Sequence, residues 1–444
     1  ANKKSPWYIV AYGMIGASLS GVTFISVPGW VGISQFSYMQ MVIGYLAGYT
    51  VIALILMPLY YRLNLTSIYT YLNQRFGKAT YKTGASFFLL SRTLGSAFRL
   101  YIVANVLQIA VFNHFNIPFQ VSVLVTLLLI LLYTFKGGIK TIIWTDTLQT
   151  TFMLLAVAFT IIHIEGDLKL GFSGMVNAVA SSDYSRIFFF DDWHDKRFFF
   201  KQFFAGAFIA IVMTGLDQDM MQKNLSCRNI TEAQKNMFWF SAVLVFVNLM
   251  FMTLGALLFI YTDAMQIVRP AKGDDLYPML ALGNYFHPVI GILFIIGLIA
   301  AAYSSADSAL TALTTSFSID ILNINRYGEK KKTKIRKLVH IGITLVMAGV
   351  IILFKEINND SVISSVFTVA GYTYGPLLGL YSFGLFTQWR IKDRWAPLVC
   401  LLSPVICYLL NMYSTELFGG YKFGFELLIV NGLLTFTGLL LIRK

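Results

Sequence analysis

Long apolar stretches alternate with short polar ones along the whole chain. The apolar runs are about 20 residues long, enough for a helix to cross a hydrocarbon core roughly 30 Å thick. Lipid offers no partner for backbone amides, and barrel strands would be about 10 residues long, so these runs are expected to be helices. The pattern predicts about twelve spans, near residues 8–30, 37–60, 82–111, 119–135, 143–164, 199–221, 235–261, 286–318, 337–354, 361–386, 395–413 and 425–442. The longest polar connection runs from Gly166 to Lys196, and a short surface helix is expected between Lys272 and Gly283.

Composition supports a membrane protein, and the distribution of charge orients it. Hydrophobic residues make up 57% of the 444 positions and charged residues only 12%, about half the share found in soluble domains. With the N-terminus in the cytoplasm, inner segments carry 23 of the 34 Lys and Arg residues and outer segments 9. This asymmetry follows the positive-inside rule. It predicts a multi-pass protein of a bacterial inner membrane with Ala1 and Lys444 in the cytoplasm, and it explains the net charge of +13 without a nucleic-acid partner.

One predicted span carries a stripe of oxygen-bearing side chains. Positions i, i+3, i+4, i+7 and i+11 share one helical face, and here they are Ser304, Asp307, Ser308, Thr311 and Thr315. Hydroxyls, carbonyls and one carboxylate form a hard-oxygen set that suits an alkali cation rather than a transition metal. An ionisable group inside a span is costly, so Asp307 indicates a functional site. The alternative is a hydrogen-bonded seam between two helices.

Two spans contain residues that interrupt a helix. The first has glycines and serines between Gly16 and Thr23, with Pro28 further along, and the sixth has the sequence Thr214 to Asp219. Broken helices expose carbonyls to an ion and amides to a substrate near the middle of the membrane. The two interruptions occupy equivalent positions in two five-helix halves, 8–164 and 199–386, which suggests an inverted repeat.

Several motifs occur in one order over nearly the whole chain. They are the run Ala301 to Leu310 (Ala-Ala-x-Ser-Ser-x-Asp-Ser-x-Leu), Lys136-Gly-Gly, Trp144 to Gln149 (Trp-Thr-Asp-Thr-Leu-Gln), Asp217 to Lys223, and Tyr374 to Gly379. In these motifs the chain resembles the sodium/solute symporter family, which includes the sodium–galactose, sodium–proline and sodium–sialic acid transporters.

The resemblance implies an all-helical membrane fold with two inverted five-helix repeats, as in the leucine transporter, and further peripheral helices. The expected division is 1–166 for the first repeat, 167–198 for an outer loop, 199–390 for the second repeat and 391–444 for the peripheral helices. Members of the family usually have one more helix before the first repeat, and we expect that helix to precede Ala1 in the natural protein.

The resemblance also implies where the coupling ion binds. By matching position, a first sodium site would use the carbonyls of Gly16, Leu19 and Ala301 and the hydroxyls of Ser304 and Ser305. Some members have a second site, which would here consist of Asp146, Ser304, Asp307 and Ser308. Other relatives have a hydroxyl at the position of Asp307, so one or two sodium ions are expected.

Two arginines in the third span are candidates for binding the solute. Arg92 and Arg99 are seven residues apart and therefore lie on about the same face. A position matching Arg99 contacts the substrate carboxylate in the sialic acid symporters that this chain resembles. The alternative is an internal ion pair of Arg92 or Arg99 with Asp146, Asp217 or Asp219, because an unpaired arginine in a membrane is costly. Asp217 and Asp219 are otherwise expected to have a gating or structural role. Further candidates for the pocket, each also explicable as packing, are Thr23, Tyr45, Gln108 and Tyr374.

These observations predict a transporter and not an enzyme. The expected activity is sodium-coupled symport of a small organic solute, a carboxylate such as a sialic-acid-like anion, by alternating access in a single chain that contacts only the solute and the lipid. The alternatives are a neutral solute such as a sugar, and proton coupling through Asp146 or Asp307. A membrane enzyme or sensor is disfavoured because the spans contain no nucleophile–base pair and no metal-ligand cluster.

Overall fold

The computed structural model describes residues 6–63, 67–134, 139–358 and 360–444. In these ranges the regular structure is helical, apart from one isolated bridge between Ile391 and Arg443. Every expected span coincides with one helix or with two or three consecutive helical segments. The corresponding elements are α1 (Trp7–Ser18) with α2 (Gly21–Ser34), α3 (Tyr38–Val51) with η2 (Ile52–Leu56) and α4 (Met57–Leu63), α6 (Lys78–Ala110), α7 (Phe119–Thr134), α8 (Ile139–Leu168), α10 (Phe199–Ala210) with η4 (Ile211–Gly215) and α11 (Gln218–Asn224), α12 (Ile230–Ala264), α14 (Pro288–Ser316) with η6 (Phe317–Ile321), α15 (Glu329–Ile357), α16 (Val362–Phe386), α17 (Ala396–Met412) and α19 (Leu427–Leu441).

Shorter elements connect these helices. They are η1 (Gln35–Ser37), α5 (Thr70–Arg75), η3 (Phe112–Phe115), α9 (Gly171–Ala180), η5 (Gly273–Asp275), α13 (Leu276–Leu282), η7 (Ile324–Arg326), η8 (Asp393–Trp395) and α18 (Ser414–Leu417). A short helix is present where the sequence predicted one after Lys272, as α13, but the expectation that it lies on the surface is wrong, because five of its seven residues are buried. Among the described residues, seven helical stretches are long and apolar enough to cross a membrane, and a bent pair makes an eighth. One of the seven, Gly21–Leu63, is 43 residues long, about twice what one crossing needs, and it turns at Gln35, where φ is 53°.

Both expected helix interruptions are present. The first falls at Leu19 and Ser20, between α1 and α2, where the Ser20 N–H donates to the Ser18 carbonyl at 3.0 Å instead of continuing the helical pattern. Pro28 does not cause this break, because it lies inside the continuous helix α2. The second interruption separates η4 from α11, with a bend of 75°. There Asp217 caps α11 by accepting hydrogen bonds from the amides of Asp219 and Met220.

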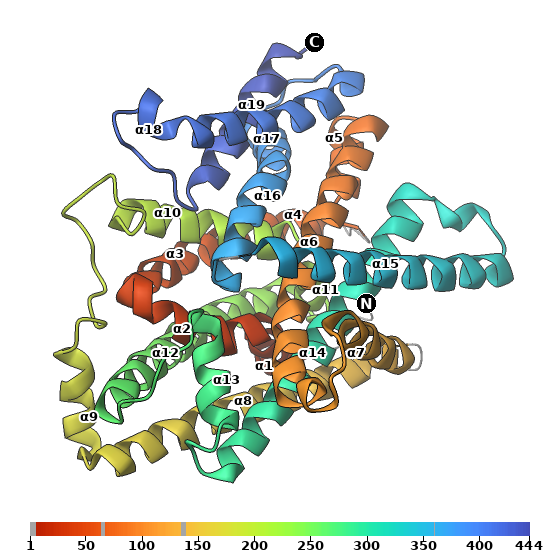
Figure 1. Cartoon of the computed structure of the whole chain (residues 1–444). Helices are drawn as coiled ribbons and strands as arrows, with labels where there is room; N and C mark the ends of the chain where they lie inside the picture. Colours follow the sequence, from red (N-terminus) through yellow and green to blue (C-terminus); the bar gives the residue numbers. More distant parts are fainter. Residues whose placement is uncertain (1–5, 64–66, 135–138, 359) are drawn as a thin grey trace.

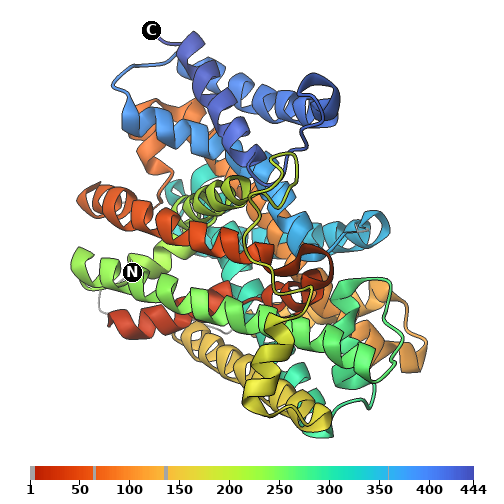
Figure 2. The same cartoon turned by 90° about the vertical axis from the view of Figure 1, so that its left-hand side faces the viewer.

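Packing arranges the helices around the interrupted segments. In one group, α12 packs against α1, α2 and α3, and α3 packs against α10; in another, α6 contacts α14 and α15. Helix α8 packs against α14 and also contacts α1, and α16 contacts α6 and α2. The C-terminal helices α17 and α19 lie at one end of the molecule beside α16 in both views (Figures 1 and 2).

Helices α3 and α10 cross at backbone distance. A Cβ atom on Gly44 would lie 2.1 Å from the Phe203 carbonyl oxygen, and one on Gly206 would lie 2.1 Å from the Met41 carbonyl oxygen. Small residues at such a crossing allow two helices to pack by direct backbone contact, which is how membrane helices associate tightly. We call this contact the glycine crossing.

Candidate functional site

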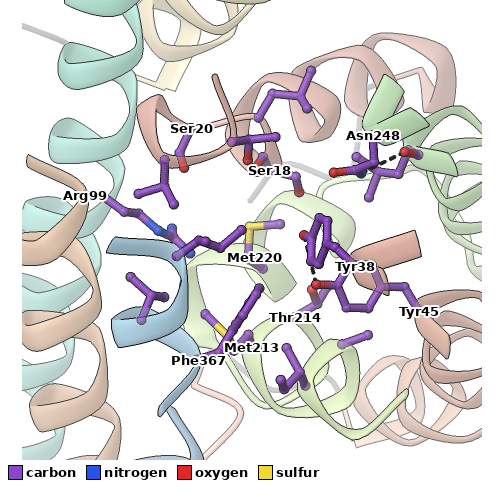
Figure 3. A pocket seen from close by; sticks show the side chains of 18 of the residues that line it. Ser18, Ser20, Tyr38, Tyr45, Arg99, Met213, Thr214, Met220, Asn248 and Phe367 are labelled. Carbon is purple, nitrogen blue, oxygen red and sulfur yellow. Dashed lines mark hydrogen bonds between the residues drawn. The ribbon is translucent and has the colours of Figure 1, made fainter. Parts of the chain in front are cut away.

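A cavity of about 110 Å³ lies where the interrupted helices meet (Figure 3). Its wall is formed by the break between α1 and α2, by α3, α6 and α12, by η4 and by the start of α16. Five of the candidate residues from the sequence line it. They are Leu19, Thr23, Tyr45, Arg92 and Arg99. The structure therefore brings together, at the first helix break, residues that are far apart in the sequence.

The two arginines of α6 have different surroundings. Arg92 is buried, and its Nη2 lies 2.6 Å from Asp219 Oδ2 while its Nη1 lies 3.7 Å from Asp217 Oδ2. The Tyr374 hydroxyl donates a hydrogen bond to the same Asp217 oxygen at 3.0 Å. Arg92 is thus neutralised inside the protein, as one of the sequence interpretations proposed.

Arg99 has no such partner. Within the described part of the chain no hydrogen bond or ion pair to its guanidinium is formed, and the side chain points toward the cavity (Figure 3). It is only partly exposed. A guanidinium in this position offers five donors in a planar fork that matches a carboxylate.

Polar groups face Arg99 from the other side of the cavity. The hydroxyls of Tyr38 and Tyr45 lie 3.1 Å apart and share a hydrogen bond. Asn248 on α12 also lines the cavity; its amide donates to the Leu244 carbonyl, and its Oδ1 is buried with no partner in the described residues. Thr214 from η4 completes this polar side.

Sequence reasoning did not select several of these lining residues. Tyr38 and Phe367 had no signal beyond their aromatic character, which is common in this chain. Asn248 could have been found as a lone amide in an apolar run, and Thr214 as part of the second interruption. Two residues that were selected lie elsewhere. The Gln108 amide donates to Asn113 and to the Ile117 carbonyl at the far end of α6, and Tyr374 belongs to the Arg92 network.

The candidate sodium ligands lie beside the helix break. Because Ser20 bonds to Ser18, the Gly16 carbonyl loses its usual helical donor. The Gln149 side-chain amide on α8 donates to it at 2.9 Å and also donates to the Leu19 carbonyl. On α14, which packs against α8 and contacts α1, the hydroxyls of Ser305 and Ser308 are buried without a hydrogen-bond partner in the described residues.

The remaining sodium candidates lie on the same stretch of α14 or outside the described side chains. Ala301 and Ser304 are buried at 1% exposure, and Asp307 is buried and accepts from the Thr311 hydroxyl at 3.3 Å. The backbone of Asp146 belongs to α8, but its side chain lies outside the described residues. No group of three or more His, Cys, Asp or Glu side chains suited to a metal occurs in the described ranges. The oxygen atoms at the break and on this stretch of α14 are carbonyls, hydroxyls and the Asp307 carboxylate. That donor chemistry fits an alkali cation.

Comparison with known proteins adds the family. The profile of the sodium:solute symporter family matches residues 1–394. The chain belongs to the sodium:solute symporter family. This family consists of transporters, so the expectation that the chain is not an enzyme is confirmed, as is the resemblance found in the sequence motifs.

Curated relatives within the sodium:solute symporter family differ in what their names say they carry. The chain is 26% identical to the human sodium/iodide cotransporter over 395 residues, 85% of this chain but only 59% of that protein. It is 26% identical to the sodium/sialic acid symporter NanT of Aliivibrio fischeri, covering 87% of this chain and 77% of the relative. Against the sodium/sialic acid symporter SiaT of Proteus mirabilis the identity is 24%, with 93% and 83% covered. All three names include sodium; one names iodide as the solute and two name sialic acid.

Solved structures of other transporters support the fold. A Na⁺-coupled sialic acid symporter in a substrate-bound, outward-open state aligns with a TM-score of 0.82 at 21% identity, covering all of this chain and 92% of that one. Mhp1, a nucleobase-cation-symport-1 family transporter, aligns at 0.60 with 13% identity, covering 99% of this chain and 93% of that one. The leucine-transporter-like fold expected from the sequence is thereby confirmed for this symporter.

Proposed function

We propose that this chain couples the inward movement of sodium to the uptake of a small organic anion that carries a carboxylate. The observation that carries the proposal is the contrast between the two arginines of α6. Both arginines line the cavity, but Arg92 is paired with two carboxylates, whereas no carboxylate among the described residues pairs with Arg99. Removing a guanidinium from water costs several kcal/mol unless an anion meets it. A bound carboxylate would supply that anion in bidentate geometry.

A neutral sugar is the weaker alternative. It would leave the Arg99 charge uncompensated in the bound state, whereas the hydroxyls of Tyr38 and Tyr45 and the amide of Asn248 could bind polar groups of either kind of solute. The sialic acid symporters among the relatives carry an acid by name, which agrees with the anionic solute.

Sodium is proposed to bind beside the α1–α2 break, next to the cavity. The proposed oxygen donors are the carbonyls of Gly16, Leu19 and Ala301 and the hydroxyls of Ser304 and Ser305, and Leu19 also lines the cavity. A shared helix break gives a physical route for coupling, because both ligands favour one arrangement of α1 and α2. Each must then raise the affinity of the other by the same factor.

The proposed setting is a bacterial inner membrane, with Ala1 and Lys444 on the cytoplasmic side and a single chain sufficient for transport. The distribution of basic residues between the predicted inner and outer segments supports this orientation.

The test is the thermal stability of the detergent-purified protein in sodium or potassium, with a panel of carboxylates and neutral sugars. We expect the midpoint to rise with sodium but not potassium, and to rise further with one class of carboxylate. In Arg99→Gln the carboxylate effect should disappear and the sodium effect should remain. Ser91→Ala is a matched control, because Ser91 is a buried polar residue of α6 whose hydroxyl only donates to the Phe87 carbonyl. A sugar response that persists in Arg99→Gln would replace the anionic solute by a neutral one. A midpoint that responds to pH but not to sodium would replace sodium by protons.

A further inference from the structure

Gln149 occupies an unusual position at the first helix break. It lies on α8, is fully buried, and reaches across to α1, where its Nε2 donates to the Gly16 carbonyl at 2.9 Å and to the Leu19 carbonyl. Its other amide atom, Oε1, is buried with no hydrogen-bond partner in the described residues. The NH₂ group of this side chain therefore donates to two carbonyls at the helix break, while its carbonyl oxygen accepts no hydrogen bond from the described residues.

The orientation of this amide follows from its neighbours. A carboxamide has one end that donates and one that accepts, and carbonyl oxygens can only accept. Turning the amide over would place three oxygens against one another without a hydrogen between them. The two carbonyls therefore fix the NH₂ end toward α1, and the unpaired Oε1 is the consequence.

The position of Nε2 is also the position that a cation would need. A hard cation binds carbonyl oxygens at roughly 2.3–2.6 Å and must approach both oxygens at once. Nε2 is within hydrogen-bonding distance of both the Gly16 and Leu19 oxygens, so it lies in the space between them. An amide nitrogen and a cation cannot both fill this space.

We propose that the Gln149 amide and sodium are alternative occupants of the space between the Gly16 and Leu19 carbonyls, so that sodium binds only when this side chain withdraws. The proposal rests on the function proposed above. In this arrangement Gln149 satisfies the carbonyls of the broken helix when no cation is bound, and it keeps α1 attached to α8. Its competition lowers the affinity for sodium, which makes the ion easier to release.

The alternative role is that of a ligand. A half-turn of the carboxamide would direct Oε1 at the cation, and Gln149 would then strengthen sodium binding. The two roles predict opposite signs for a variant that has neither donor nor acceptor. A purely structural role predicts a third result, a loss of stability that sodium does not change.

The experiment compares wild type with Gln149→Leu and Gln149→Met, which keep an apolar side chain of similar size. The measurements are equilibrium binding of radioactive sodium to the purified protein and the thermal midpoint in potassium and in saturating sodium. Because two hydrogen bonds no longer compete, we expect sodium to bind roughly 5- to 150-fold more tightly. The midpoint in potassium should fall, and saturating sodium should restore it to near the wild-type value. Methionine serves as the second variant if the leucine variant does not fold.

Thr160→Val is the matched control. Thr160 is a fully buried residue of the same helix whose hydroxyl bonds to Tyr277 and to the Ala156 carbonyl, away from the break. Its loss should lower the midpoint equally in sodium and potassium and leave the sodium dissociation constant unchanged. Weaker sodium binding in both Gln149 variants would overturn the competition in favour of the ligand role, and unchanged binding would reduce Gln149 to a packing residue. If wild type itself binds no sodium, the proposed function fails first, and the two failures are therefore distinguishable.

Discussion

Replacing Arg92 by glutamine tests how much the buried ion pairs of Arg92 beside the cavity stabilise the fold. The arginine side chain is 9% exposed and faces two carboxylates that are 0% and 10% exposed, Asp217 and Asp219. Asp217 would keep the amides of Asp219 and Met220 and the hydroxyl of Tyr374 as hydrogen-bond donors. Asp219 would lose the cation that lies 2.6 Å away.

Removing one partner of a buried ion pair costs roughly 3–5 kcal/mol, because the other charge stays buried without compensation. Unfolding entropies of about 2.1 cal/mol/K per residue give a chain of 444 residues about 0.9 kcal/mol per degree. The expected fall in the thermal midpoint is therefore about 3–5 °C. Thermal unfolding in detergent, followed by intrinsic fluorescence, measures it.

A surface pair provides the control. Arg186 and Asp191 also form an ion pair, but their side chains are 49% and 75% exposed. Such pairs contribute about 0–1 kcal/mol, so Arg186→Gln should lower the midpoint by about 1 °C or less. The double variant Arg92→Gln/Asp219→Asn should recover part of the loss, because it removes the uncompensated carboxylate. An Arg92→Gln midpoint within 1 °C of wild type would refute the view that this network stabilises the fold.

Three further predictions concern other parts of the chain. Burial raises the pKa of Asp274, in the segment outside the spans, to about 6, although the amide of Val362 donates to it. The pKa of an aspartate in the unfolded chain is about 3.9, so the folded protein favours the protonated carboxyl. The free energy of unfolding is therefore highest below about pH 4 and falls by at most about 3 kcal/mol as the pH rises through 6. Asp274→Asn should flatten this part of the curve of thermal midpoint against pH. Gly206→Leu should abolish folding, because the leucine side chain would overlap the Met41 carbonyl oxygen. The yield of monodisperse protein in size-exclusion chromatography measures this effect. Ser305→Ala should raise the sodium concentration needed for half-maximal stabilisation tenfold or more, without lowering the thermal midpoint in potassium. An equal loss of midpoint in both salts would contradict a role as an ion ligand.

Much of the fold could be predicted because hydropathy shows which segments are apolar enough to cross a membrane. It does not show where a helix ends, and several helices here continue into polar segments. Helix α15 begins at Glu329 rather than near 337, within a basic run whose residues still form helical hydrogen bonds. The first interruption was predictable from its glycines and serines, but the effect of Pro28 was misjudged, since α2 continues through it.

The candidate site was harder to predict, because its members are distinguished by partners and not by type. Arg92 and Arg99 have the same spacing and the same chemistry in the sequence, and only the position of Asp217 and Asp219 separates their roles. Gln149 stood in a recognised motif, yet nothing in a linear pattern shows that its amide reaches two carbonyls on another helix.

The glycine crossing has a consequence for how the solute is handled. Because the two backbones are in direct contact, we expect α3 and α10 to move together. Tyr45 lies on α3, whereas Arg99 lies on α6, which packs with α14 and α15. If these two groups of helices shift against each other during transport, a solute that contacts both Tyr45 and Arg99 links the two groups. We therefore expect shorter analogues that contact only one group to be transported poorly.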